Sequence, residues 1–177
     1  MKKTMLMLAA LTAGLTGCRE KGRSTEDLAA VAEVDPGRYA GVWYEIARLP
    51  NRFEEGLDEV TATYEPLEGG GLKVVNRGRK AGKLREVTGR ARAADPENPG
   101  SGELEVSFFW PFYGAYRILY LAEDYSLAVV TSSTRDYLWI LARKPVLPPA
   151  ALQPLLERAA VMGFAVEKLE YPSPVRE

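Results

Sequence analysis

The sequence predicts an all-β fold: an eight-stranded antiparallel up-and-down β-barrel, followed by a helix and a ninth short strand. Eight segments rich in Val, Ile, Leu, Thr and Tyr are separated by short turn segments, so each is expected to pair antiparallel with the next. Apolar and polar residues alternate along several segments, as in 103–108, so one face of the sheet is dry. Eight such strands close into a barrel because closure leaves no exposed edge.

The elements are predicted in order along the chain. The predicted strands are residues 41–49, 59–67, 72–79, 84–93, 103–109, 115–122, 126–132 and 137–143. A helix is predicted between Pro148 or Pro149 and Gly163, because apolar residues recur there at helical spacing. Residues 164–171 are predicted to form the ninth strand.

Composition excludes several kinds of chemistry. The 177 residues carry 23 basic and 24 acidic side chains, which does not suggest general nucleic-acid binding. The chain has no His, which excludes Ser-His, Cys-His and His-metal sites, and we expect neither a metal nor a cofactor. The single cysteine, Cys18, cannot form an internal disulfide.

The N-terminus is typical of a secretory signal. Two lysines precede an apolar run that is too short to span a membrane, and small residues follow. Residues 15–18 resemble a bacterial lipobox, which implies cleavage after residue 17 and lipidation of Cys18; a plain signal peptide or a buried thiol is the alternative. Arg19, in place of Asp, favours the outer membrane, with the protein on its periplasmic face. We therefore divide the chain into a signal peptide (1–17), a lipidated tether (18–35) and a barrel domain (36–177).

Three short motifs carry a resemblance to a known family. The first opens the first strand, the second lies between the sixth and seventh strands, and the third ends the eighth. Their residues are Gly41, Trp43, Asp124, Tyr125 and Arg143. In this order they resemble the G-x-W, T-D-Y and Arg signatures of the lipocalins, with Glu123 in place of the Thr. The surrounding strands look most like the bacterial outer-membrane lipocalins and apolipoprotein D.

The resemblance implies a barrel with one closed and one open end. Trp43 would plug the closed end, and Arg143 would lie across its indole, which contributes about 0.5–2 kcal/mol as a cation–π contact. Both roles are structural. The loops at the open mouth would be residues 50–58, 79–83, 110–114 and 133–136.

Strand parity and the resemblance together predict a ligand cavity. An eight-stranded barrel is large enough to hold one small ligand. The predicted cavity residues are Val60, Ala62, Tyr64, Val74, Asn76, Leu104, Val106, Phe108, Tyr116, Ile118, Tyr120 and Trp139. The alternative is that these side chains fill the barrel as a packed core. Small inward residues such as Gly89 and Ala91 favour a cavity.

The mouth carries aromatic and basic residues. Phe109, Trp110, Phe112 and Tyr113 either pack on the rim or form an apolar lip that touches membrane or a second copy of the chain in a homodimer. The basic residues Arg79, Lys80 and Lys83 either form a solvated outer face or meet lipid phosphates.

The sequence therefore favours a binding protein over an enzyme. We expect a lipid-anchored envelope lipocalin that stores, scavenges or transports a fatty acid or lysophospholipid. One alternative is an envelope enzyme that acts on lipid without His; its best candidate, Glu45, shares the parity of Trp43 but is expected to pair with an Arg or Tyr. The other alternative is a structural lipoprotein with a filled barrel.

Overall fold

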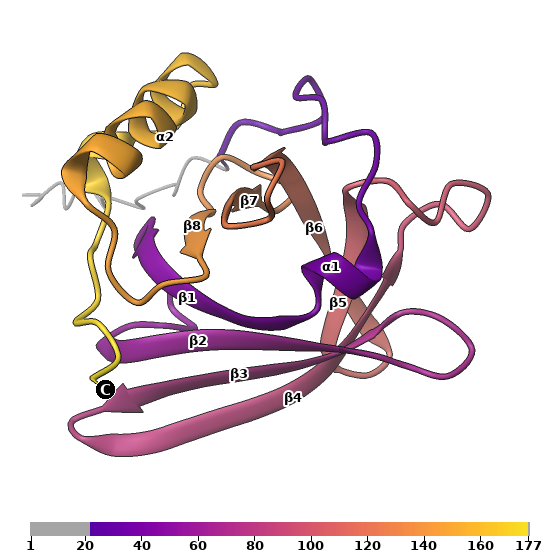
Figure 1. Cartoon of the computed structure of the whole chain (residues 1–177), viewed down its shortest axis with the longest axis horizontal. Coiled ribbons are helices and arrows are strands. Elements are labelled where there is room, and N and C mark those ends of the chain that lie inside the picture. Colours follow the sequence, from indigo (N-terminus) through magenta and orange to yellow (C-terminus); the bar gives the residue numbers. More distant parts are fainter. Residues whose placement is uncertain (1–21, 177) are drawn as a thin grey trace, which may run out of the picture.

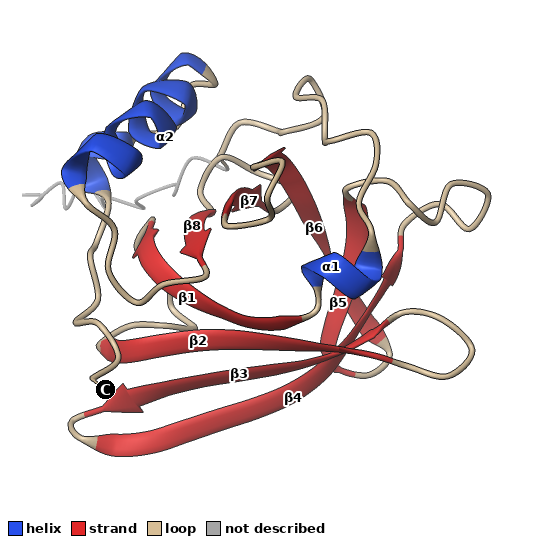
Figure 2. Ribbon diagram, in the orientation of Figure 1, coloured by secondary structure: helices blue, strands red, loops and turns tan. Residues whose placement is uncertain are grey.

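The computed structural model describes residues 22–176 as a closed barrel of eight antiparallel strands (Figures 1 and 2). Each strand pairs with the next, and the last returns to the first, which confirms the predicted fold class. The strands are β1 (Gly41–Arg48), β2 (Leu57–Pro66), β3 (Leu72–Lys80), β4 (Lys83–Ala93), β5 (Glu103–Phe109), β6 (Phe112–Leu121), β7 (Leu127–Thr131) and β8 (Leu138–Ala142). The predicted signal peptide and Cys18 lie outside the described residues.

Two helices and one 3-10 turn accompany the barrel. They are α1 (Pro36–Tyr39), α2 (Pro149–Val161) and η1 (Val166–Lys168). Asp35 caps α1, since its side chain accepts hydrogen bonds from the backbone N–H groups of Gly37 and Arg38. None of the helices among residues 22–176 is both long enough and apolar enough to cross a membrane.

The barrel wall separates two apolar cores. The inner core joins Trp43 and Tyr39 at the closed end to side chains such as Ile118 and Val130. The outer core lies between the wall and α2, which packs against the outside of the barrel (Figure 2). Successive residues of one strand alternate between the two cores, so Val130 faces inward while Val129 faces α2.

β-bulges interrupt this alternation in several strands. One lies in β6, between Ile118 and Tyr120, where the pairing with β7 shifts its register. A bulge adds one residue to a strand and so reverses which face the following side chains occupy. Sequence parity therefore fails in β6 beyond Ile118.

The predicted ninth strand is wrong except at one residue. Residues 166–168 form η1, and within the predicted strand only Glu170 pairs with the barrel, through two backbone hydrogen bonds with Arg48 of 3.0 and 2.8 Å. The pairing of β1 with β2 stops before Arg48, and the short free edge that remains accommodates a single bridge. Phe164 and Leu169 instead bury their side chains in the outer core beneath α2.

The predicted tether also needs correction. Residues 22–35, called the N-terminal strap from here on, pack along the outside of the barrel from the β7–β8 loop to α1 (Figure 1). The backbone N–H of Thr25 donates to Ser133, and that of Val31 donates to Ile118 (3.1 and 2.9 Å). Thr25 is fully buried. The part of the tether that the structure describes is therefore fixed to the domain.

Two arginines hold the strap. Arg117 of β6 donates to the carbonyls of Thr25 and Leu28 and to the Glu103 carboxylate. Arg135, in the β7–β8 loop, makes a two-pronged contact with Asp27 at 2.9 and 2.8 Å. Charge-assisted bonds of this kind are about twice as strong as neutral ones.

Candidate functional site

The closed end of the barrel is built around Trp43. The indole is fully buried, and its Nε1 donates to the carbonyl of Tyr39 at 2.8 Å. The Arg143 guanidinium lies 4.0 Å from the ring centroid and also donates to carbonyls of the α1 region. Gly41 has φ of +95°, and a Cβ there would come within 3.3 Å of Arg143 Nη1. These residues form a plug rather than a ligand site.

The turn between β6 and β7 completes this plug. Asp124 accepts hydrogen bonds from the backbone and the hydroxyl of Ser126. The Tyr125 hydroxyl accepts from the Asp35 N–H at 2.9 Å, and the Arg38 guanidinium lies 4.0 Å from its ring centroid. The turn thus fastens the end of the strap and α1 across the bottom of the barrel.

Most of the predicted cavity residues lie on the inner face. Tyr64, Val74 and Ile118 are buried in the inner core near the plug. Those that pack against this core but keep part of their surface accessible are Ala62, Val106, Phe108, Tyr116 and Trp139. These five side chains point inward and remain partly accessible, as the wall of a ligand cavity would.

The remaining predicted cavity residues take different positions. Val60 is buried beside Gly78 of β3. Leu104 pairs with Tyr116 across β5 and β6 and is half-buried. Asn76 pairs with Ala62, and its Oδ1 is buried without a hydrogen-bond donor among residues 22–176.

Tyr120 is a wrong prediction. Its side chain packs in the outer core beneath α2, where the Arg158 guanidinium lies 4.7 Å from the ring centroid. The cause is the bulge after Ile118, which reverses the parity on which the prediction depended. Tyr120 is therefore a structural contact and not a ligand contact.

Three tyrosines supply the polar groups nearest the plug. The Tyr116 hydroxyl lies 2.7 Å from that of Tyr39 and 2.8 Å from that of Tyr64. Burial raises the pKa of Tyr64 to about 12 and the pKa values of the other two well above their usual range. All three stay neutral at physiological pH, so this end of the interior carries hydroxyls and no charge.

Gly89 of β4 makes room for Phe108. A Cβ at Gly89 would lie 2.7 Å from a ring carbon of Phe108 and 2.4 Å from the Ser107 carbonyl oxygen. The absence of a side chain at Gly89 therefore leaves room for the phenyl ring next to the β4 backbone, on the inner face. A small residue at this position favours space inside the barrel, and the Phe108 ring occupies part of that space.

A charged cluster lines the wall near the mouth. The buried Glu45 carboxyl accepts a hydrogen bond from Arg48 Nη1 at 2.7 Å, which agrees with the expectation that Glu45 pairs with an arginine. Glu54, from the β1–β2 loop, accepts from the Trp139 indole at 2.8 Å. Glu54 is not among the residues that the sequence predicts, because nothing in a polar loop indicates that one carboxylate turns inward.

Burial and the neighbouring Glu54 raise the pKa of Glu45 to about 8, although Arg48 acts in the opposite direction. The folded protein therefore holds a proton that the unfolded chain releases near pH 4.5, the ordinary value for this carboxyl. The contribution of this proton to the free energy of unfolding is fully present below pH 4.5 and is lost as the pH rises to about 8.

We expect Glu45→Gln, which mimics the protonated carboxyl, to match the wild type at pH 5 and to exceed its unfolding free energy at pH 9 by about 2–4 kcal/mol, since one pKa unit corresponds to about 1.4 kcal/mol. Urea unfolding at the two pH values measures this difference. A Gln variant that is less stable than the wild type at pH 9 would show that the ionised Glu45–Arg48 pair is stabilising.

The mouth aromatics divide into two groups. Phe109, Trp110 and Phe112 are exposed. Tyr113 instead packs on the outer wall, with the Arg92 guanidinium 4.0 Å from its ring centroid. Tyr113 thus packs on the wall rather than on the rim, and the other three are left exposed at the mouth.

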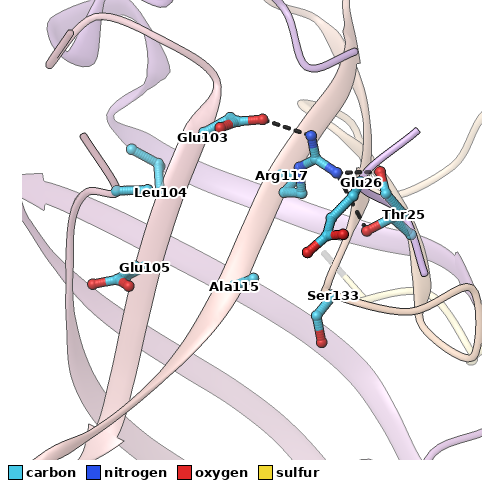
Figure 3. Close-up of a pocket in the computed structure, with 9 residues that line it drawn as sticks. Thr25, Glu26, Glu103, Leu104, Glu105, Ala115, Arg117 and Ser133 are labelled. Atoms are coloured by element: carbon cyan, nitrogen blue, oxygen red, sulfur yellow. Dashed lines mark hydrogen bonds and ion pairs between the residues drawn. The ribbon is translucent and has the colours of Figure 1, made fainter. Parts of the chain in front are cut away.

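A hollow of about 410 Å³ lies outside the barrel, between the strap and strands β5 and β6 (Figure 3). Thr25, Glu103 and Arg117 line it, and Arg117 donates hydrogen bonds to the other two. This hollow marks where the strap joins the barrel, and Leu104 from the predicted cavity set also lines it. No group of three or more His, Cys, Asp or Glu among residues 22–176 is placed to hold a metal ion.

Comparison with known proteins defines the class. A sequence model described as a lipocalin-like domain matches residues 34–174, so the chain belongs to the lipocalin family, as its motifs indicated. The outer membrane lipoprotein Blc of Escherichia coli strain K12 is 39% identical over 168 residues, which cover 95% of each chain. Apolipoprotein D of Rattus norvegicus is 38% identical over 164 residues, or 84% of each chain.

Solved structures show the same fold. Insecticyanin from the tobacco hornworm Manduca sexta superimposes with a TM-score of 0.72 at 19% sequence identity. The match covers 86% of this chain and 87% of that one. At this identity the likeness concerns the fold alone.

Proposed function

We propose that this chain is a lipid-anchored envelope lipocalin that binds a single-chain amphiphile, such as a fatty acid or lysophospholipid, inside the barrel. The observation that carries the proposal is the inner face above the plug, where Val106, Phe108 and Trp139 point inward and stay partly accessible. Pockets for small ligands are mostly apolar with a few polar groups. Binding of this kind requires no reaction, and we propose storage, scavenging or transport rather than catalysis.

The chemistry of the wall supports an acyl chain with a polar end. Transfer of an acyl chain from water to this wall gains about 25 cal/mol per Å² of apolar surface. Asn76 Oδ1 offers an unused acceptor inside the barrel, which suits a hydroxyl or a bound water. Glu54 and Arg48 place charge near the mouth, where a polar headgroup remains.

The proposed location depends on the N-terminus and the relatives. The lipobox-like residues 15–18 provide an acylation site at Cys18. The relatives from Citrobacter freundii, Escherichia coli and Vibrio cholerae are named outer membrane lipoproteins. We accordingly place this chain at the outer membrane, held by acyl chains on Cys18; more than one chain is needed for stable anchoring.

Lipid that co-purifies with the protein tests this function. The protein is extracted from membranes in mild detergent, washed, and analysed by mass spectrometry beside a Phe108→Asp variant. We expect single-chain amphiphiles in the wild type and a depleted amount in the variant. Equal lipid in both proteins, or none above background in either, contradicts the proposal.

A further inference from the structure

The strap fixes the start of the domain at the mouth of the barrel. Ser24 pairs with Thr134, and the Gly22 N–H donates to the Asp136 carboxylate at 3.1 Å. Thr134 and Asp136 lie in the β7–β8 loop, which the up-and-down topology places at the same end as the β1–β2, β3–β4 and β5–β6 loops. The polypeptide therefore enters the described structure at the open end and not at the plug.

The distance from this point to the lipid anchor is short. Cys18 and Gly22 are four residues apart, and four residues span at most about 14 Å when fully extended. The strap itself is fixed to the barrel, so it adds nothing to the distance between Cys18 and the mouth. Thr25 is fully buried, and Arg135 of the β7–β8 loop holds Asp27. An acylated Cys18 thus keeps the β7–β8 loop close to the bilayer surface.

The loops on either side of the β7–β8 loop carry exposed aromatic rings. Phe53 lies in the β1–β2 loop and is 66% exposed, while Phe109, Trp110 and Phe112 around the β5–β6 turn are 74%, 85% and 78% exposed. These four are all the exposed Phe and Trp residues among residues 22–176. Aromatic rings of this kind favour the interface between membrane and water.

The same end carries unpaired positive charge. Lys80 and Lys83 flank the β3–β4 turn, are exposed, and form no ion pair within residues 22–176. Arg52 is exposed beside Phe53, with its guanidinium 4.8 Å from the ring centroid. Exposed Glu55, Asp58 and Asp136 lie at the same end, also form no ion pair within residues 22–176, and offset much of this charge. Cations beside aromatic side chains suit a surface of lipid phosphates.

We infer that the mouth loops form a membrane-docking surface, on which Phe53, Phe109, Trp110 and Phe112 enter the headgroup region of the leaflet that holds the Cys18 acyl chains. The barrel opening then faces this leaflet, and an amphiphile passes between bilayer and interior without crossing bulk water. The inference rests on the proposed acylation of Cys18. It commits to a lipid surface as the partner of these aromatics, in preference to a second copy of the chain.

Quenching by brominated lipid tests the orientation. The acylated protein is reconstituted into vesicles of phosphatidylethanolamine and phosphatidylglycerol with bromine on their acyl chains, and tryptophan emission is compared between the wild type and Trp110→Phe. We expect the wild type to lose an emission component that the variant lacks. The matched control adds Glu68→Trp to the Trp110→Phe background. Glu68 is exposed in the β2–β3 loop at the closed end, and we expect no added quenching there.

Three results overturn the inference. Quenching at position 68 that equals or exceeds that at Trp110 means that the closed end faces the bilayer. Trp110 emission that brominated lipid does not quench means that the aromatics do not contact lipid. Cross-linking that shows Trp110 in the interface of a dimer has the same meaning. Protein that does not float with the vesicles means that anchoring fails as well, so flotation separates failure of the proposed location from failure of docking alone.

Discussion

Replacement of Trp43 by Ala is expected to lower the unfolding free energy by about 3–5 kcal/mol, the usual loss for a large aromatic side chain in a core. The indole is fully buried between Tyr39, at 5.0 Å between ring centroids, and the Arg143 guanidinium. Each kcal/mol lowers the Tm of a domain of this size by about 2–4 °C, so the Tm should fall by about 6–20 °C. Calorimetry of the wild type and the variant measures it.

Arg143→Ala provides the companion measurement. It removes the cation above the indole and leaves carbonyls of Arg38, Tyr39 and Ala40 without this donor. We expect a Tm loss of several degrees, because about 1–2 kcal/mol is lost. Ligand affinity measured well below the Tm should stay unchanged, and a large affinity loss at unchanged stability would place the ligand at the wrong end of the barrel.

Phe108→Asp is expected to weaken amphiphile binding at least tenfold, or about 1.4 kcal/mol. The ring lies over Gly89 on the inner wall, where an introduced carboxylate finds no cationic partner among the residues that pack there. Binding of an acyl chain would remove this unpaired carboxylate from water, and the free-energy cost of doing so weakens binding. Titration of folded wild-type and variant protein with oleic acid measures the change in Kd.

Tyr120→Ala serves as the control for this experiment. Its side chain is also aromatic and also belongs to the barrel wall, but it faces the outer core and Arg158. We expect it to lower the Tm and to leave the Kd for oleic acid unchanged. If Tyr120→Ala weakens binding as much as Phe108→Asp does, general loosening of the barrel accounts for both.

The barrel could be predicted from sequence because its signal is repeated in every strand. Alternation along β5 places Leu104 and Val106 on one face of the sheet and Glu103 and Glu105 on the other. Short turns between the strands predict that each strand pairs antiparallel with the next. The same parity rule fails for Tyr120. The cause is a bulge that adds a single residue to β6. No residue type indicates such a bulge in the way that Gly or Pro indicates a turn.

The strap and the charged wall escaped prediction for a different reason. Residues 22–35 are charged and rich in small residues, which is typical of a linker. They are fixed by groups from distant strands and loops, among them Arg117 and Arg135. Glu54 likewise turns inward because the Trp139 indole, 85 residues further along the chain, donates to it. Contacts between distant parts of the chain cannot be read from local patterns.

A titration that follows Trp139 tests the central claim, that the barrel binds an amphiphile in its interior. Oleic acid and lysophosphatidylcholine are added separately to the wild type and to Trp139→Phe. Trp139 faces the interior and is partly accessible, whereas Trp43 is buried in the plug and Trp110 lies outside on the β5–β6 turn. We predict a saturable change in emission for the wild type that is lost in Trp139→Phe, while the variant still binds. Absence of saturable binding of either amphiphile to the wild type would contradict the account.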